Sequence, residues 1–178
     1  MTTLNRIDIL TDSELSSKII YQTGKYDCGQ SIIRLLIREY NFKIQEEDPL
    51  LSSDLPLSML NMKLIFERIG FNCKGYAFEN AENMMDWLDN CTYKECILLM
   101  KNTSCYYKYM KSPSFLDKYM NIFISENPQI GHWVLLHSHT QDKVILLDPF
   151  WGVLNLDKAV LNVIWEGKCL ILNKKNQS

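Results

Sequence analysis

Residues 132–148 read HWVLLHSHTQDKVILLD, and the interpretation of the chain starts from this stretch. Two apolar runs flank a polar segment, Ser138–Lys143, a pattern typical of two antiparallel strands joined by a turn. The expected strands are Trp133–His137 and Val144–Asp148. Pro149 then ends the second strand, because proline has no N–H to donate to a strand ladder. The sequence therefore predicts a β-hairpin with a carboxylate at the end of its second strand.

This hairpin is expected to bring a histidine and that carboxylate together. With the turn centred on residue 140, His132 lies opposite Asp148, and side chains at alternate positions share a face. The same register pairs Val134 with Leu146 and Leu136 with Val144. Directly opposed Cβ atoms are roughly 4.5–5.5 Å apart, close enough for a carboxylate to hydrogen-bond an imidazole. A slip of one residue would separate the two side chains, and the alternative interpretation is a surface His–Asp pair of little energetic value.

Outward from the hairpin, the sequence predicts mainly helices in the first half of the chain and mostly strands in the second. The expected helices include Ser31–Tyr40 and Ala81–Leu88. Between them, Asp54 and Pro56 indicate the start of a further helix, which ends at Gly70. The further expected strands are Phe71–Phe78, Glu95–Met100 and Cys169–Leu172. Residues 1–20 form a lead-in with a short strand at Ile7–Leu10, and residues 101–129 form an insertion or lid that is too long for an ordinary connection. The fold class is therefore α+β, a helical part followed by an antiparallel sheet, in a single domain over residues 1–178.

Cys28 stands immediately before the Ser31 helix, within Tyr26-Asp27-Cys28-Gly29-Gln30. A thiol in this position feels unpaired N–H groups and the positive end of the helix dipole, and both favour the thiolate that attacks carbonyls. Gly29 removes side-chain bulk beside the sulfur, so that a substrate backbone can come close. The alternative is a buried cysteine that simply begins a helix, since free cysteine is among the most buried residue types. A partner residue is needed to choose between the two.

Cys28, His132 and Asp148 together supply such partners. A nucleophile, a base and a third group that orients the base are the general arrangement for covalent acyl transfer. Gln22, six residues before Cys28, carries a side-chain amide that can donate to the same carbonyl oxygen as the Cys28 backbone N–H. The alternative for Gln22 is an exposed loop residue. The residues thus predict a thiol nucleophile, an acid/base histidine, an orienting aspartate and an oxyanion donor.

The bulk composition excludes several function classes. The charge is −2, from 19 basic and 21 acidic residues, so no global field favours nucleic acid or an anionic membrane. Asp8, Asp12 and Glu14 argue against a signal peptide, and no run approaches the roughly 18 apolar residues of a membrane span. We therefore expect a cytoplasmic protein with free thiols, no nucleic-acid partner and no membrane span.

Four segments of the chain resemble the peptidase C39 family, the papain-like peptidases that process bacteriocins by cutting leader peptides after a double glycine. They are QTGKYDCG (22–29), GHWVLL (131–136), LDPFWG (147–152) and WEGKCLIL (165–172). The resemblance implies a papain-like fold and a thiol peptidase without metal or other cofactor, acting on a peptide or protein substrate. It implies Gln22 as oxyanion donor, Cys28 as nucleophile, His132 as base and Asp148 as orienting group.

The chain differs from the bacteriocin-processing members of that family in two respects. Bacteriocin-processing members are usually the N-terminal domain of a membrane ABC transporter, whereas this chain is similar to the stand-alone members. The span 101–129 is longer than the family leads us to expect. A eukaryotic group known as guanylyl-cyclase-domain-containing proteins is similar in its Asp-Cys-Gly start and its Gly-His strand. Nucleotide cyclisation is disfavoured here, because the sequence has neither paired carboxylates spaced for two metals nor a Gly-rich phosphate loop.

Three other functions are compatible with part of these sequence features. The same triad can serve an acyl transferase or a deamidase, because the shape of the pocket decides what resolves a thioester. A peptidase fold can also bind a peptide without cutting it, and the tyrosines of the insertion (Tyr106, Tyr107, Tyr109 and Tyr119) are typical of recognition surfaces. A zinc site built from Cys91, Cys96, Cys105, His137 and His139 is a third rival, but its spacings do not match the usual short pairs.

Two tryptophans flank the predicted site. Trp133 follows His132, and Trp151 lies three residues after Asp148. We expect at least one of them to wall the substrate groove and to favour small residues beside the scissile bond. The alternative is that both belong to the core.

Overall fold

The computed structural model describes residues 6–102, 106, 109–110 and 130–176. Its helices are α1 (Ser13–Lys18), α2 (Cys28–Glu39), α3 (Met59–Ile69), α4 (Ala81–Asp89) and α6 (Lys158–Ile164), with a 3-10 turn η1 (Pro49–Ser52). Its strands are β1 (Ile7–Leu10), β2 (Phe71–Ala77), β3 (Glu95–Met100), β4 (His132–His139), β5 (Lys143–Asp148), β6 (Gly152–Asp157) and β7 (Trp165–Lys174). The α+β class is confirmed.

The described strands form one sheet in the order β1-β6-β5-β4-β3-β7-β2, with every neighbouring pair antiparallel. Strand β4 lies at the centre, between β5 and β3. The last strand, β7, is inserted between β3 and β2, so that the end of the chain is paired on both sides. The position of β4 matters because it carries the histidine of the predicted site into the middle of the molecule.

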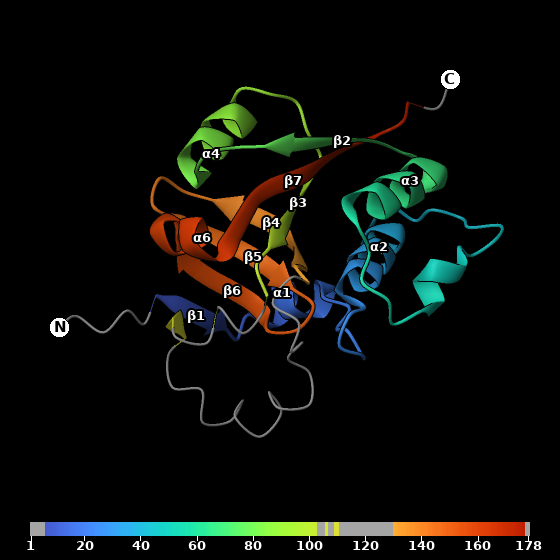
Figure 1. Ribbon diagram of the computed structural model, residues 1–178, viewed down its shortest axis with the longest axis horizontal. Helices are drawn as coiled ribbons and strands as arrows, with labels where there is room; N and C mark the ends of the chain where they lie inside the picture. The colour runs from blue at the N-terminus through green and yellow to red at the C-terminus, as the bar shows by residue number, and fades with distance from the viewer. Residues whose placement is uncertain (1–5, 103–105, 107–108, 111–129, 177–178) are drawn as a thin grey trace.

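Helices cover both faces of this sheet (Figure 1), with α2 and α3 on one side and α4 and α6 on the other. The side chains of β4 alternate between the two layers, as a strand requires. Val134 and Leu136 belong to the buried cluster that contains α4 and α6. Trp133 and Leu135 belong to the cluster that contains α2 and α3. The sheet is therefore the middle of three layers, with an apolar core on each side.

Helix α2 packs against β4 through its apolar flank. Ile32, Ile33, Leu35 and Leu36 are buried, whereas Arg34 and Arg38 keep more than two fifths of their side chains exposed. This is the pattern expected of an amphipathic helix that lies on a core. The helix begins at Cys28, three residues earlier than predicted, because the Ser31 N–H already bonds the Asp27 carbonyl at 3.0 Å.

The predicted hairpin exists, but its predicted register is wrong. Leu136 lies opposite Leu146 rather than Val144, and a bulge follows, after which Ser138 pairs with Ile145. The turn is centred between Gln141 and Asp142 rather than on residue 140, which lengthens β4 up to His139. The one extra residue of the bulge then changes the register by one, so that the pairing before the bulge differs from the prediction by two positions. Asp148 is therefore diagonal to His132 instead of directly opposite it. A shift of two residues keeps every side chain on its own face, so the prediction that His132 and Asp148 share a face is correct.

Other predictions differ from the structure in detail. Helix α3 begins at Met59 with Ser58 and Asn61 forming a capping box, not at Asp54. It ends at Gly70, whose φ of 124° suits glycine. Helix α1 within the lead-in was not predicted. The insertion or lid predicted at 101–129 lies mostly outside the described residues.

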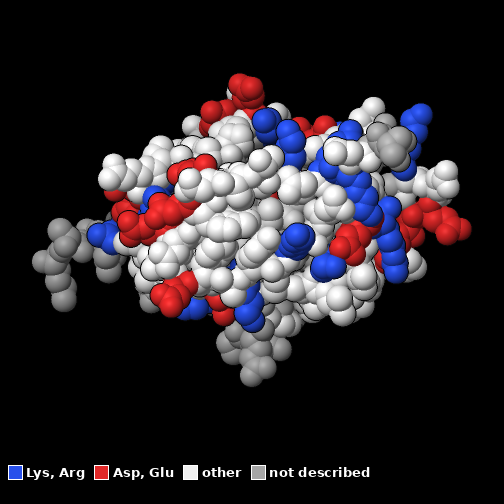
Figure 2. Space-filling model, turned by 90° about the horizontal axis from the view of Figure 1, so that it is seen from above, with Lys and Arg blue, Asp and Glu red and all other residues white. Residues whose placement is uncertain are grey.

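The described surface carries charges of both signs. Figure 2 shows acidic and basic side chains on the same face, in small groups separated by uncharged residues. Within the described residues, no helix is long and apolar enough to cross a membrane.

Candidate active site

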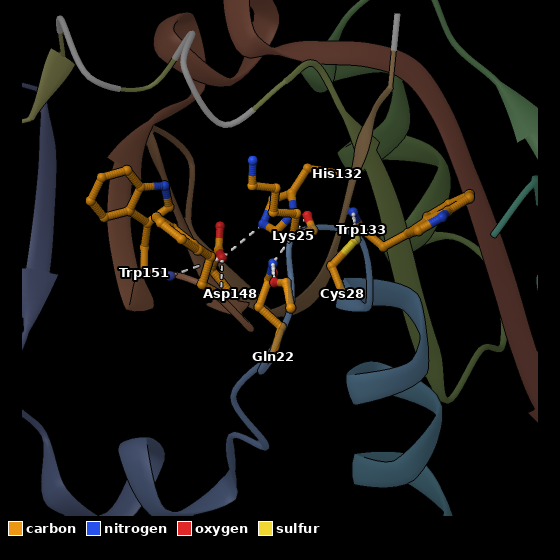
Figure 3. Close-up of polar contacts among 9 residues, drawn as sticks. Gln22, Lys25, Cys28, His132, Trp133, Asp148 and Trp151 are labelled. Carbon is orange, nitrogen blue, oxygen red and sulfur yellow. Dashed lines mark hydrogen bonds and ion pairs between the residues drawn. The ribbon is translucent and has the colours of Figure 1, made fainter. Parts of the chain in front are cut away.

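Cys28 is the first residue of α2, and its sulfur faces the start of β4 (Figure 3). The backbone N–H of Trp133 donates a hydrogen bond to the Cys28 Sγ, with 3.4 Å between the two atoms. Only 5% of Cys28 is exposed, yet it forms part of the lining of a surface groove. The Trp133 backbone thus contacts the sulfur on one side, and the groove gives access to it from the other.

The loop before Cys28 is organised by Asp27. Its carboxylate does not cap α2 but turns back to accept hydrogen bonds from the Thr23 N–H at 3.0 Å and the Gly24 N–H at 2.9 Å. The loop that joins Gln22 to Cys28 therefore has a fixed shape, and the first N–H groups of α2 keep no side-chain cap from Asp27. Unsatisfied N–H groups of this kind favour negative charge at the start of a helix.

His132 lies between Cys28 and Asp148. Its Nε2 is 2.8 Å from the Asp148 Oδ1, and both residues are buried. The same Oδ1 accepts hydrogen bonds from the N–H groups of Phe150 at 2.8 Å and Trp151 at 3.1 Å. These two bonds come from the turn after Pro149, so the end of β5 fixes the carboxylate, and the carboxylate fixes the imidazole ring.

The surroundings of His132 change its protonation. Burial lowers the pKa of the ring, but the negative charge of Asp148, the nearby Cys28 sulfur and the hydrogen bond to Asp148 raise it more. The result is a pKa raised from 6.5 to about 10. Because Nε2 is engaged by Asp148, Nδ1 is the nitrogen left for the sulfur. The geometry favours a protonated His132 ring at neutral pH beside the Cys28 sulfur, and a Cys–His pair is the arrangement that thiol nucleophiles use.

The structure adds contacts that sequence reasoning missed. The Tyr106 ring lies edge-on to the His132 ring, with 6.0 Å between the ring centroids. The Gln22 N–H donates to the Pro149 carbonyl at 2.9 Å, which ties the loop before Cys28 to the end of β5. A backbone donor such as the Trp133 N–H leaves no residue-type signal, so only the predicted strand start at Trp133 could have indicated it.

Gln22 lies beside Cys28, His132 and Asp148, but its amide also hydrogen-bonds within its own loop (Figure 3). The Gln22 Nε2 donates to the Gly24 carbonyl at 2.9 Å and approaches the Lys25 carbonyl at 3.5 Å. The second distance is at the outer limit of a hydrogen bond. One of the two N–H groups is therefore firmly engaged, and the other is weakly held.

A groove with a volume of about 290 Å³ opens at the Cys28 sulfur. Most of its lining is apolar: Pro56, Leu57, Ser58, Met59, Leu99, Ile130, Gly131 and Trp133 complete it. Trp133 is thus the tryptophan that the structure places at the groove, and its Nε1 donates to the Leu57 carbonyl at 2.8 Å.

Two residues predicted to touch substrate, Trp151 and Gly29, are not among those that line this groove. Trp151 is buried in the core cluster on the α4 and α6 side and is not part of the groove lining. Gly29 is buried behind the groove. A Cβ at Gly29 would lie 2.9 Å from the Met62 Sδ and 3.2 Å from the Trp133 Cδ1. The glycine therefore lets α2 approach Trp133 closely, and its contact with substrate stays a prediction.

The structure does not support the zinc hypothesis in the residues that it describes. Among them, no group of three His, Cys, Asp or Glu side chains is placed to hold a metal ion. Cys96 and Cys169 are fully buried neighbours on β3 and β7. Cys105 lies outside the described residues.

Comparison with solved structures identifies the fold as that of a papain-like cysteine peptidase domain. The peptidase domain of Streptococcus ComA, a bi-functional ABC transporter, aligns with a TM-score of 0.58 at 13% identity, covering 88% of this chain and 98% of that chain. A double glycine motif protease from an AMS/PCAT transporter, in complex with its leader peptide, aligns with a TM-score of 0.58 at 15% identity, covering 96% and 94%. The peptidase domain of Streptococcus mutans ComA gives a TM-score of 0.55 at 14% identity, covering 88% and 98%. No curated protein matches the chain.

The sequence match agrees with the structural one. The model of the peptidase C39 family matches residues 16–177, which is nearly the whole chain. The chain therefore belongs to the peptidase C39 family, and the predicted resemblance is confirmed.

Proposed function

We propose that this chain is a cysteine peptidase that cleaves a peptide or a leader segment through Cys28, His132 and Asp148. The observation that supports this most directly is the position of His132, which is hydrogen-bonded to Asp148 through Nε2 and interacts with the Cys28 thiol. The Trp133 N–H on the sulfur and the groove that ends at Cys28 support it further. Membership of a cysteine peptidase family makes the chemistry plausible for each of these residues.

The proposed reaction begins with attack of the Cys28 thiolate on the scissile carbonyl carbon. A C–S bond forms, and the carbonyl oxygen becomes an oxyanion. The imidazolium of His132 then gives its proton to the leaving amine as the C–N bond breaks, which leaves a thioester on Cys28. A water molecule loses a proton to the neutral ring and attacks the thioester, and Cys28 departs as thiolate while His132 is again protonated.

The oxyanion needs hydrogen-bond donors that are in place before it forms. The Cys28 backbone N–H at the start of α2 and the weakly held N–H of Gln22 are the proposed donors. Anchoring of Gln22 through its backbone to Pro149 supports this role, because a rigid donor costs no reorganisation during the reaction.

The proposed substrate is a peptide that lies in the groove beside Cys28. The apolar lining by Leu57, Met59, Leu99 and Trp133 suits uncharged side chains near the scissile bond. The solved AMS/PCAT protease is in complex with the leader peptide, which supports a peptide segment as the ligand class here.

The test is selective alkylation of Cys28 followed by a cleavage assay. Iodoacetamide labelling is measured site by site by mass spectrometry, and Cys91 is the internal control, because burial raises the pKa of that thiol. Cys28 is expected to react much faster than Cys91 at neutral pH, and His132→Ala is expected to remove the difference. Equal labelling of Cys28 and Cys91 in the wild type would contradict the proposal.

A peptide library incubated with the wild type and with Cys28→Ala then tests turnover. Cleavage products are expected only with the wild type. The same incubation with a free amine added separates hydrolysis from acyl transfer, because a transferase forms an amine adduct where a peptidase forms an acid.

A further inference from the structure

Residues 50–58, which we call the strap, run from η1 to the start of α3 and supply one side of the groove. Pro56, Leu57 and Ser58 belong to the groove lining. Most of the strap lies outside regular secondary structure, so neighbouring strands do not hold it. Two of its side chains, Leu51 and Leu57, are buried in the core. The rest of its position depends on side chains that bind its backbone.

Gln30 is the residue that binds the strap backbone most extensively. Its Nε2 lies 2.7 Å from the Leu55 carbonyl, 3.2 Å from the Ser53 carbonyl and 3.3 Å from the Leu50 carbonyl. The side chain is buried, with only 2% of the residue exposed. The orientation of the amide is fixed, because a reversed amide would point its oxygen at three carbonyl oxygens.

Two further hydrogen bonds to the strap start beside the proposed catalytic residues. Trp133, the neighbour of His132, donates from Nε1 to the Leu57 carbonyl at 2.8 Å. Asp54 accepts from the Tyr26 N–H at 2.8 Å, two residues before Cys28. Gln30 itself lies two residues after Cys28 on the same helix. The strap is therefore attached to the same backbone that carries the thiol and the imidazole.

We propose that Gln30 is a positioning residue that holds the strap as a wall of the substrate groove. This inference rests on the peptidase function proposed above and adds to it the origin of the groove's shape. Gln30 does not touch the reacting atoms. Its loss should weaken peptide binding while the Cys28–His132 pair stays intact.

The experiment compares Gln30→Met with the wild type and with Arg34→Met. Methionine keeps the length of the side chain and removes the donors. Arg34 lies one turn further along α2 and donates to the Leu51 carbonyl at 2.8 Å, so Arg34→Met removes a comparable bond at the far end of the strap. Amide hydrogen exchange of residues 53–58 and peptide kinetics are measured for all three proteins, with iodoacetamide labelling of Cys28 as a probe of the thiol.

The expected result has three parts. Exchange in residues 53–58 of Gln30→Met rises about tenfold or more. The KM for a cleaved peptide rises about tenfold, while kcat changes by less than about threefold. Iodoacetamide labels Cys28 at the wild-type rate within about twofold, because the small reagent does not need the groove wall. Arg34→Met is expected to leave the exchange of residues 53–58 and the KM unchanged.

Other outcomes separate this inference from the proposed function. Wild-type cleavage together with unchanged KM and exchange in Gln30→Met would overturn the role of Gln30 alone. A wild type that shows no Cys28-dependent cleavage would overturn the peptidase proposal and this inference with it. Should Gln30→Met fail to fold, Gln30→Asn, which keeps the amide but is one methylene shorter, is measured in the same way.

Discussion

The His132 Nε2 lies 2.8 Å from the Asp148 Oδ1, although the pairing of β4 with β5 places the two residues diagonally rather than directly opposite one another. Diagonal neighbours on one face have Cα atoms roughly 7–8 Å apart, a distance that a histidine and an aspartate can bridge with their side chains. The turn after Asp148 makes this possible, because the N–H groups of Phe150 and Trp151 orient the carboxylate toward the ring. The pair is therefore set by the end of β5 as much as by the register of the hairpin.

Asp148→Asn is expected to lower kcat by roughly 10⁴-fold without unfolding the protein. Asparagine keeps an Oδ1 that can accept the hydrogen bonds from Phe150, Trp151 and His132, so the ring stays in place. Only the Oδ2 position becomes an NH₂ group, and in the described part of the chain Oδ2 accepts no hydrogen bond. What is lost is the negative charge that stabilises the imidazolium. Steady-state kinetics and urea denaturation of the same sample measure the two effects.

The matched control for that variant is Asp142→Asn, in the exposed turn between β4 and β5. It removes the same charge on the same hairpin but away from the ring. Its kcat is expected to equal that of the wild type. A similar fall in both variants would mean that general charge, and not the contact with His132, causes the loss.

The pH dependence of activity is expected to follow His132. Its pKa is raised to about 10, so the ring keeps the proton that the leaving amine needs well above the ordinary value of 6.5. The alkaline limb of kcat/KM should therefore have its midpoint near pH 10, with activity falling as pH rises. Asp148→Asn removes one of the charges that raise the pKa, so its alkaline limb should move to lower pH. An alkaline limb near pH 6.5 in the wild type would contradict the geometry.

The raised pKa of His132 also makes the free energy of unfolding depend on pH. Because the folded-state pKa lies above the unfolded value of 6.5, the protonated ring contributes fully to stability below pH 6.5. That contribution is lost as pH rises through about 10. Urea denaturation between pH 6 and pH 10 should show this decline, and His132→Gln should remove the part that is due to the ring.

Much of the fold could be predicted because its elements have strong periodicity. The bounds of β1 and β3 agree with the predicted strands, and the hairpin β4–β5 was found from its polar turn. The register was wrong because the turn lies beyond residue 140, where it was predicted, and because the bulge after Leu136 has no sequence signal of its own. The position of β7 between β3 and β2 was also beyond prediction, since pairing between strands far apart in sequence depends on the whole core.

The candidate site was predictable to a similar degree. Chemistry-bearing residues at a helix start and at strand ends indicated Cys28, His132 and Asp148, because a short list of residue types can do acyl transfer. Backbone donors gave no such indication, and neither did the second role of Gln22 in its own loop. The burial of Trp151 could not be read from a motif, because tryptophan serves grooves and cores equally well.

Gln22→Ala is expected to lower kcat by roughly 10²–10³-fold, the usual cost of losing one oxyanion donor. Iodoacetamide labelling of Cys28 should stay close to the wild-type rate, because alkylation forms no oxyanion. The two measurements together separate an oxyanion role from a loss of loop structure. A parallel fall in cleavage and labelling would indicate that Gln22 acts by holding the loop through the Gly24 carbonyl.

Trp133→Phe and Trp151→Phe form a matched pair that separates a groove residue from a core residue. Trp133→Phe leaves the Leu57 carbonyl without its donor, so it should lower the free energy of unfolding by about 1–3 kcal/mol. It should also change which side chains are accepted beside the scissile bond, because Leu57 and Trp133 both line the groove. Trp151 makes no hydrogen bond through its buried Nε1 to the described residues. Trp151→Phe therefore removes an unsatisfied donor and loses some of the packing contacts of the larger ring. We expect this variant to leave peptide selectivity unchanged, as measured with the same peptide library. Altered selectivity in Trp151→Phe, with none in Trp133→Phe, would place the substrate on the other side of the sheet from the groove at Cys28.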